Sequence, residues 1–65
     1  MRIEVNGEAR EVAGPTLADA LGELGWGPAR VATALNGAFV PKAARAGTAL
    51  KDGDRLEVLA PMQGG

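Results

Sequence analysis

The chain has 65 residues, a formal net charge of -1 and a hydrophobic fraction of 46%, with no cysteine and no histidine. This length fits one domain, and its apolar content is enough for a packed core. The absence of thiol and imidazole groups excludes the usual zinc and iron-sulfur ligand sets and any Cys-His catalytic pair, and the lack of a basic stripe argues against nucleic-acid binding.

Residues 1–12 predict a β-hairpin. Met1–Asn6 alternate apolar and polar residues, which is the pattern of a half-buried strand. Asn6-Gly7 is a strong signal for a type I′ turn, because both central residues of that turn need a positive φ. Glu8–Val12 is the expected return strand, with Ala9 and Val12 as modest apolar contributors.

A short helix is predicted next, over about residues 17–24. Thr16 is placed as its N-cap, and Asp19 completes a shortened capping box. Gly25 suits the position after the helix, and Gly27-Pro28 prevents its continuation. The apolar residues recur at helical spacing and define one face: Leu17, Ala20, Leu21 and Leu24.

The remaining chain predicts short strands. Val31–Leu35 is a strand that ends at a second Asn-Gly turn, and Phe39-Val40 pairs back briefly before Pro41. Residues 42–49 are ambiguous, because their alanines and arginines favour a helical turn that Gly47 interrupts. Residues 51–54 predict a turn and Arg55–Leu59 a last strand.

This order predicts an α+β fold, a mixed sheet of four to five strands packed on one helix. Right-handed crossover geometry places the first and last strands side by side and parallel. The expected division is a domain at 1–59 and a flexible, protruding tail at 60–65. Strand parity directs these residues toward the helix: Ile3, Val5, Val31, Leu35, Leu56 and Val58.

The tail ends in Gly64-Gly65, which presents a carboxylate on an arm without side chains. Glycine has no Cβ, so such an arm can enter a narrow active site. Taken alone, a Gly-Gly end is more often a frayed terminus.

Three segments resemble the small sulfur-carrier proteins of thiamine biosynthesis, the ThiS family, which has the ubiquitin-like β-grasp fold. They are residues 31–37 (VATALNG) with 40–42 (VPK), residues 50–59 (LKDGDRLEVL) and residues 62–65 (MQGG). The resemblance extends over the whole chain. It departs from the family in having no aromatic residue at 42–46, and in Trp26, which matches no family position.

The resemblance implies a function for the tail. An E1-like adenylyltransferase adenylates Gly65 with ATP and magnesium, a sulfur-donating cysteine enzyme supplies sulfur, and the Gly65 thiocarboxylate donates it to thiazole synthase. Gly64, Gln63 and Met62 thread into the partner. The chain is then a covalent co-substrate, not an enzyme, and binds no cofactor or metal itself.

A partner-binding patch is predicted beside the tail. Strand parity directs four apolar residues away from the helix: Phe39, Leu59, Ala32 and Ala34. Exposed apolar patches often mark interaction sites. Alternatively, Phe39 folds over the sheet edge, and the two alanines are merely tolerated at their positions and have no role in binding.

Other residues have simpler readings. Trp26 is expected to cap the helix end, with a partner anchor as the alternative. Lys42, Lys51 and Arg55 are expected to be solvated. Asp52 and Asp54 are expected to bond turn amides rather than a cation.

Other functions stay open: a small subunit of molybdopterin synthase, a carrier for another pathway, a ubiquitin-like modifier that joins Gly65 to lysine, or a regulatory domain. We expect a cytoplasmic monomer without a leader, since a strand-like segment begins at Met1, and without a membrane span, since no apolar run approaches ~20 residues.

Overall fold

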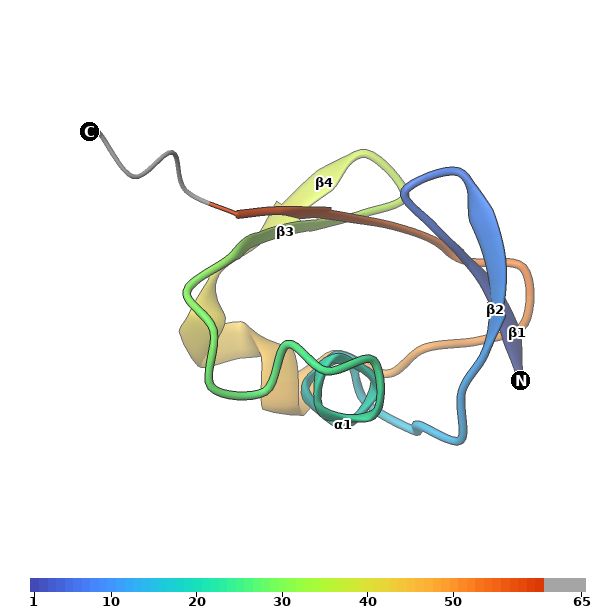
Figure 1. The fold of residues 1–65 in the computed structure, drawn as a ribbon, viewed down its shortest axis with the longest axis horizontal. Helices are drawn as coiled ribbons and strands as arrows, with labels where there is room; N and C mark the ends of the chain where they lie inside the picture. Colours follow the sequence, from blue (N-terminus) through green and yellow to red (C-terminus); the bar gives the residue numbers. More distant parts are fainter. Residues whose placement is uncertain (61–65) are drawn as a thin grey trace.

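The computed structural model describes residues 1–60 and shows a five-stranded sheet with helices on one face (Figure 1). The elements are β1 (Arg2–Val5), β2 (Glu8–Glu11), α1 (Leu17–Glu23), β3 (Ala32–Leu35), β4 (Ala38–Val40), the 3-10 helix η1 (Lys42–Gly47) and β5 (Arg55–Leu59). The strand order is β2-β1-β5-β3-β4. This arrangement confirms the predicted mixed sheet and single α-helix.

The last strand, β5, lies at the centre of the sheet. It runs parallel to β1, with Val5 opposite Leu56, and antiparallel to β3, with Thr33 opposite Val58. The two hairpins, β1-β2 and β3-β4, therefore flank β5. The predicted adjacency of the first and last strands is confirmed.

Both Asn-Gly turns are confirmed, and their asparagine side chains bind β5. Asn6 and Asn36 have φ values of 49° and 51°. The Asn6 amide accepts a hydrogen bond from the Val58 N–H at 2.8 Å and donates one to the Val58 carbonyl at 3.1 Å. The Asn36 Oδ1 accepts from the Arg55 N–H at 2.9 Å. We call these two sets of contacts the asparagine bridges; they join both flanking hairpins to the central strand.

The ends of α1 are closed as predicted. Thr16 Oγ1 accepts from the Asp19 N–H at 3.1 Å, and Asp19 Oδ2 accepts from the Thr16 N–H at 3.2 Å, a complete capping box. At the other end the Trp26 N–H donates to the Leu21 carbonyl at 2.8 Å, and Gly25 has a φ of 95°. This is a Schellman motif, and half-buried Trp26 packs against the core, as expected of a cap over the helix end.

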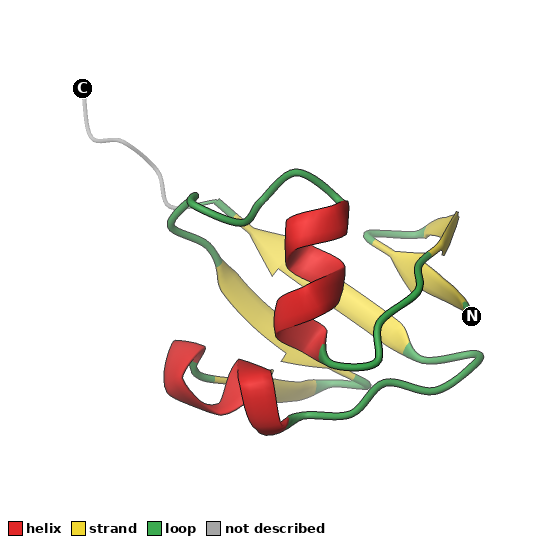
Figure 2. Cartoon of the chain, turned by 90° about the horizontal axis from the view of Figure 1, so that it is seen from below, coloured by secondary structure: helices red, strands yellow, loops and turns green. Residues whose placement is uncertain are grey.

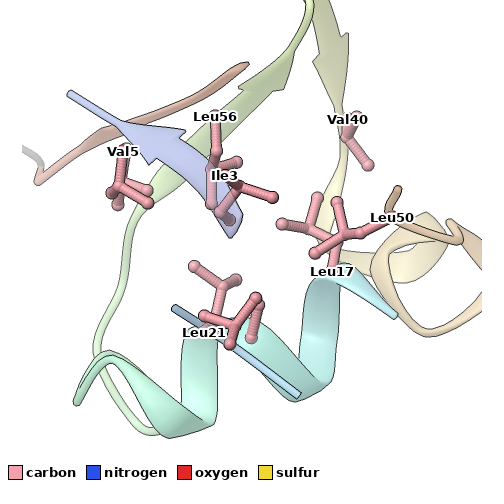
Figure 3. Close-up of a cluster of buried hydrophobic side chains, with 10 residues drawn as sticks. Ile3, Val5, Leu17, Leu21, Val40, Leu50 and Leu56 are labelled. Atoms are coloured by element: carbon pink, nitrogen blue, oxygen red, sulfur yellow. The ribbon is translucent and has the colours of Figure 1, made fainter. Parts of the chain in front are cut away.

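The core lies between the sheet and α1, which crosses its inner face (Figures 2 and 3). Val31 and Leu35 are half-buried at its margin, where strand parity predicts them. Ala9 is exposed, so its predicted apolar contribution is wrong: it pairs with Glu4, whose side of the sheet faces solvent. The buried apolar residues are Ile3, Val5, Val12, Leu17, Ala20, Leu21, Val40, Leu50, Leu56 and Val58.

The ambiguous segment at 42–49 forms η1, with Gly47 as its last residue. Arg45 is only 8% exposed, although arginine is rarely buried. Its Nε donates to Thr33 Oγ1 at 3.0 Å and its Nη2 donates to the Val31 carbonyl, while the Thr33 hydroxyl donates to the Val40 carbonyl. Arg45 thus holds η1 against β3 and the residue before it, a contact that sequence patterns did not indicate.

The turn before β5 is built on aspartates, as predicted. Asp54 is 2% exposed and accepts from the Lys51 N–H at 2.9 Å and from Asn36 Nδ2 at 3.0 Å; the Lys51 ammonium lies 3.2 Å away. Asp52 accepts from the Arg2 N–H. Burial raises the pKa of Asp54, but the hydrogen bonds from Asn36 and Lys51 outweigh it, and the pKa lies below its usual value.

We predict that Asn6→Gly lowers the free energy of unfolding by about 1–2 kcal/mol, because two hydrogen bonds to Val58 are lost. Glycine tolerates a positive φ at least as well as asparagine, so backbone strain at this position should not itself lower the free energy of unfolding. Urea unfolding measures the change. Stability equal to or above that of the unmodified chain would contradict the bridging role of Asn6.

We predict that Asp54→Asn destabilises the fold at pH 7 by about 2 kcal/mol, because charge-assisted hydrogen bonds are lost. The folded pKa of Asp54 lies below 3.8, its ordinary value. Its stabilising contribution is therefore present above that value and disappears as the pH falls through the folded pKa. Urea unfolding measures the free energy of unfolding of the unmodified chain and of Asp54→Asn between pH 7 and pH 2.5, and the difference between them should shrink as the pH falls. Glu57→Gln, which removes an exposed carboxylate, is the control. A constant difference would refute the account.

Candidate functional site

The outer face of the sheet, opposite α1, carries exposed apolar side chains. Phe39 is 69% exposed and Leu59 is 70% exposed, the large hydrophobic residues of 1–60 that the fold leaves mostly in water. Neither contributes to the core. Exposure of apolar side chains to water is unfavourable, so neighbouring exposed apolar residues often mark a binding surface.

The strand register brings the four predicted patch residues together. Ala34 lies opposite Phe39 on β3 and β4, and Ala32 lies opposite Leu59 on β3 and β5. Residues opposite one another on neighbouring strands share a face of the sheet, so these four form one area. We call Phe39, Ala34, Ala32 and Leu59 the apolar patch. Val40 is the buried residue of β4, which fits the outward direction predicted for Phe39.

The apolar patch forms one part of a groove of about 520 Å³ on the same face. Phe39 lines this groove, with Leu59 and both alanines. Charged residues extend it across β5 to β1: Glu57, Arg55 and Glu4. The groove therefore joins an apolar part, formed by β3, β4 and the last residue of β5, to a charged part formed by β1 and the earlier residues of β5.

The patch lies next to the start of the predicted tail. Leu59 is the final residue of β5 and Ala60 follows it as an exposed residue. Leu59 is therefore the patch residue nearest in the sequence to the predicted tail. The predicted site residues Met62, Gln63, Gly64 and Gly65 lie outside the described residues, as does most of the predicted 60–65 tail.

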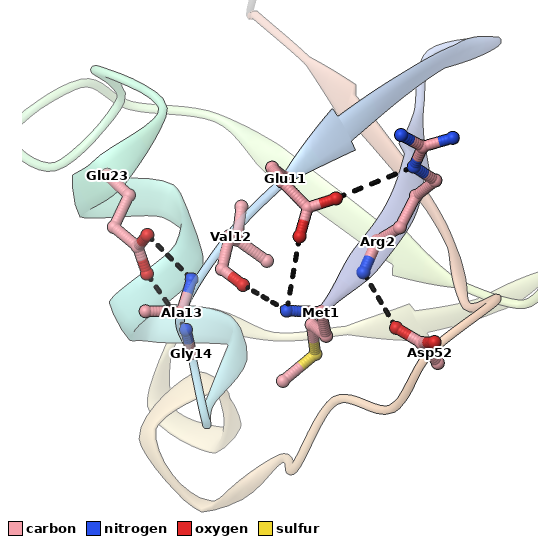
Figure 4. Close-up of polar contacts among 8 residues, drawn as sticks. All are labelled: Met1, Arg2, Glu11, Val12, Ala13, Gly14, Glu23 and Asp52. Carbon is pink, nitrogen blue, oxygen red and sulfur yellow. Dashed lines mark hydrogen bonds and ion pairs between the residues drawn. The ribbon is translucent and has the colours of Figure 1, made fainter.

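A separate group of polar contacts ties the N-terminal strand pair to α1 (Figure 4). The Met1 ammonium donates to the Val12 carbonyl at 2.7 Å and lies 3.6 Å from Glu11. Glu23 accepts from the N–H groups of Ala13 and Gly14, and these bonds hold its pKa below the usual range. Each of these carboxylates has a partner inside the chain, so we read the group as structural.

The described residues show no arrangement for metal binding. Residues 1–60 hold no cluster of three or more Asp, Glu, His or Cys side chains suited to an ion. Lys42, Lys51 and Arg55 are exposed, as expected. Over the same residues, the helices are too short and too polar to span a bilayer.

Comparison with known proteins identifies the family. The model of the ThiS family matches residues 3–65, nearly the whole chain. The chain belongs to the ThiS family. The resemblance of the three sequence segments is thereby confirmed.

Two relatives extend the comparison. The crystal structure of the thiamine biosynthesis protein ThiS from Geobacter metallireducens superposes with a TM-score of 0.83, at 35% identity and over 100% of both chains. This match confirms the β-grasp fold of the ThiS family for this chain. A thiazole synthase from Paramagnetospirillum magneticum is 41% identical over 66 residues, and this chain spans 20% of its length.

Proposed function

We propose that this chain is a sulfur carrier of thiamine biosynthesis, with sulfur held as a thiocarboxylate at Gly65. The observation that carries the proposal is the family match, which extends from residue 3 to residue 65 and so includes the Gly-Gly segment. The full-length likeness to a thiamine biosynthesis protein supports it. The proposal requires that Gly65 carry a free carboxylate in the working protein.

The proposed chemistry begins with activation of that carboxylate. A carboxylate is a poor electrophile, so one of its oxygens attacks the α-phosphorus of ATP and pyrophosphate leaves. The product is an acyl-adenylate. An E1-like adenylyltransferase holds the ATP and magnesium for this step. A persulfide on the cysteine of a partner then attacks the Gly65 carbonyl carbon and expels AMP, which gives an acyl disulfide. A second thiol attacks the cysteine sulfur of that acyl disulfide, so that the Gly65 thiocarboxylate is released and a disulfide forms between the two thiols.

The chain itself supplies recognition and the acceptor carbon. It contains no cysteine, so the sulfur nucleophile comes from a partner, a sulfur-donating cysteine enzyme. No catalytic residue is assigned to this chain, which acts as a co-substrate in the cytoplasm alongside those enzymes.

Thiazole synthase is the proposed acceptor of the sulfur. A segment similar to this whole chain forms about a fifth of a longer protein named thiazole synthase. Two functions joined in one polypeptide commonly act on one another, because the linkage raises their effective concentration. This relative supports thiazole formation over the other sulfur-transfer pathways.

The apolar patch is the proposed docking surface for the adenylyltransferase. It adjoins the residue where β5 ends, so an enzyme that binds the tail covers Leu59 and its neighbours on β3. Burial of Phe39 and Leu59 supplies apolar contact area, which commonly concentrates binding free energy.

We predict that Gly64→Val, or deletion of Gly65, abolishes transfer of AMP to the chain, because a Cβ widens the tail and narrows its backbone freedom. Intact mass after incubation with ATP, the adenylyltransferase and a sulfur source measures this. Gly22→Ala, on an open side of α1, is the control and should react normally. The unmodified chain should exchange one oxygen for sulfur. Conjugates on lysine side chains, or unimpaired AMP transfer to the variants, would refute the proposal.

We predict that the double variant Phe39→Asp, Leu59→Asp binds the adenylyltransferase at least about tenfold more weakly, because an apolar contact is replaced by two solvated charges. Its unfolding free energy should change by only about 0.5 kcal/mol per site, since both side chains are exposed. Calorimetric titration measures the affinity. Ala18→Asp with Ala43→Asp adds the same charge at exposed alanines outside the patch and is the control. Full affinity of the patch variant would exclude this surface.

A further inference from the structure

Two carboxylates of the outer face have no partner within the described part of the chain. The sequence has eight Asp and Glu residues. Six of them bond backbone amides or pair with cations: Glu8, Glu11, Asp19, Glu23, Asp52 and Asp54. The two left over, Glu4 and Glu57, both line the groove.

Of these two carboxylates, Glu57 borders the apolar patch. It lies opposite Ala34 on β3, which in turn lies opposite Phe39, and along β5 it is two residues from Leu59 on the same face. Glu4 lies one step further away, opposite Arg55 on β5. Arg55 is the cation among the residues that line the groove. It lies opposite Glu4 on β1 and two residues from Glu57 along β5, and it forms no ion pair with either carboxylate within the described residues. The groove thus holds two carboxylates and one guanidinium, a net negative charge, and Glu57 is the carboxylate at the border of the apolar patch.

Covering the apolar patch removes water from this charge. A protein that packs on Phe39, Ala34 and Leu59 also covers the neighbouring position on β5. An ionised carboxylate withdrawn from water without a counter-charge is strongly unfavourable. A partner with a purely apolar or acidic surface opposite Glu57 therefore binds more weakly than a partner that places a cation at that position.

We propose that Glu57 determines which protein can dock on the apolar patch, by requiring an arginine or lysine of that protein opposite its carboxylate. The inference rests on the proposed function and assigns this role to the interface with the adenylyltransferase. A second copy of the chain meets the requirement poorly: a two-fold pairing of this face brings together four carboxylates and two guanidinium groups, a net repulsion between like charges.

The test is titration of the adenylyltransferase with four proteins: the unmodified chain, Glu57→Lys, Glu57→Gln and Glu8→Lys. Glu8 is an exposed carboxylate on the edge strand β2, outside the groove, so its reversal makes the same change in net charge. Affinities are measured by calorimetry at low and high salt, and AMP transfer by intact mass. Urea midpoints establish that all four are folded.

We expect Glu57→Lys to weaken binding about tenfold or more at low salt and Glu57→Gln to weaken it less, since reversal juxtaposes like charges whereas neutralisation only removes an attraction. High salt should reduce both losses, because it screens charges at the interface margin. Glu8→Lys should bind within about twofold of the unmodified chain, as surface charges outside an interface contribute little.

Each alternative outcome overturns a different statement. Unchanged binding of Glu57→Lys, with weak binding of the Phe39, Leu59 double variant, removes the role of Glu57 and leaves the proposed function intact. Equal losses of affinity for Glu57→Lys and Glu8→Lys would mean that the change in net charge alone weakens binding, and they also overturn the inference. Failure of the unmodified chain to accept AMP contradicts the proposed function, and the inference falls with it. Self-association that Leu59→Asp abolishes would make a second copy the occupant.

Discussion

The position of β5 at the centre of the sheet is the constraint on which the rest of the structure depends. Two neighbours fix this strand, β1 in parallel and β3 in antiparallel pairing, and the Asn6 and Asn36 side chains add hydrogen bonds from both hairpin turns. A central strand paired on both sides can neither slip its register nor rotate without breaking two ladders. The outward row of β5, which includes Glu57 and Leu59, is therefore held in place.

This constraint bears on the proposed function, in which the chain supplies a recognition surface and its partners supply the catalysis. The fold holds exposed Phe39 and Leu59 on one face of the sheet, and β5 ends at Leu59. An enzyme that recognises the face also locates the start of the tail. In the proposed function, the folded domain thus supplies binding and positioning, the Gly65 carbonyl carbon is the reacting atom, and the partners hold the other reagents.

Local signals predicted most of the fold, because each predicted element had its own short-range cause. Positive φ at Asn6 and Asn36, the Thr16–Asp19 capping box and the alternation in β1 and β5 can all be read within a few residues. The apolar patch also followed from strand parity. What local patterns missed depends on distant contacts. Arg45 is buried because it meets Thr33 and the Val31 carbonyl from another element, and Ala9 is exposed because of the residue it pairs with. The unpaired state of Glu4 and Glu57 within the described residues likewise emerges only once the contacts of the other six carboxylates are known.

The central claim is that the chain carries sulfur at Gly65, and the most direct measurement is the mass of the C-terminal peptide of the protein isolated from its own cells under thiamine starvation. The account predicts a peptide that ends at Gly65, with a fraction in which one terminal oxygen is replaced by sulfur. A polypeptide that continues past Gly65 without processing, or a terminus found only as the carboxylate while thiamine is being made, would contradict it.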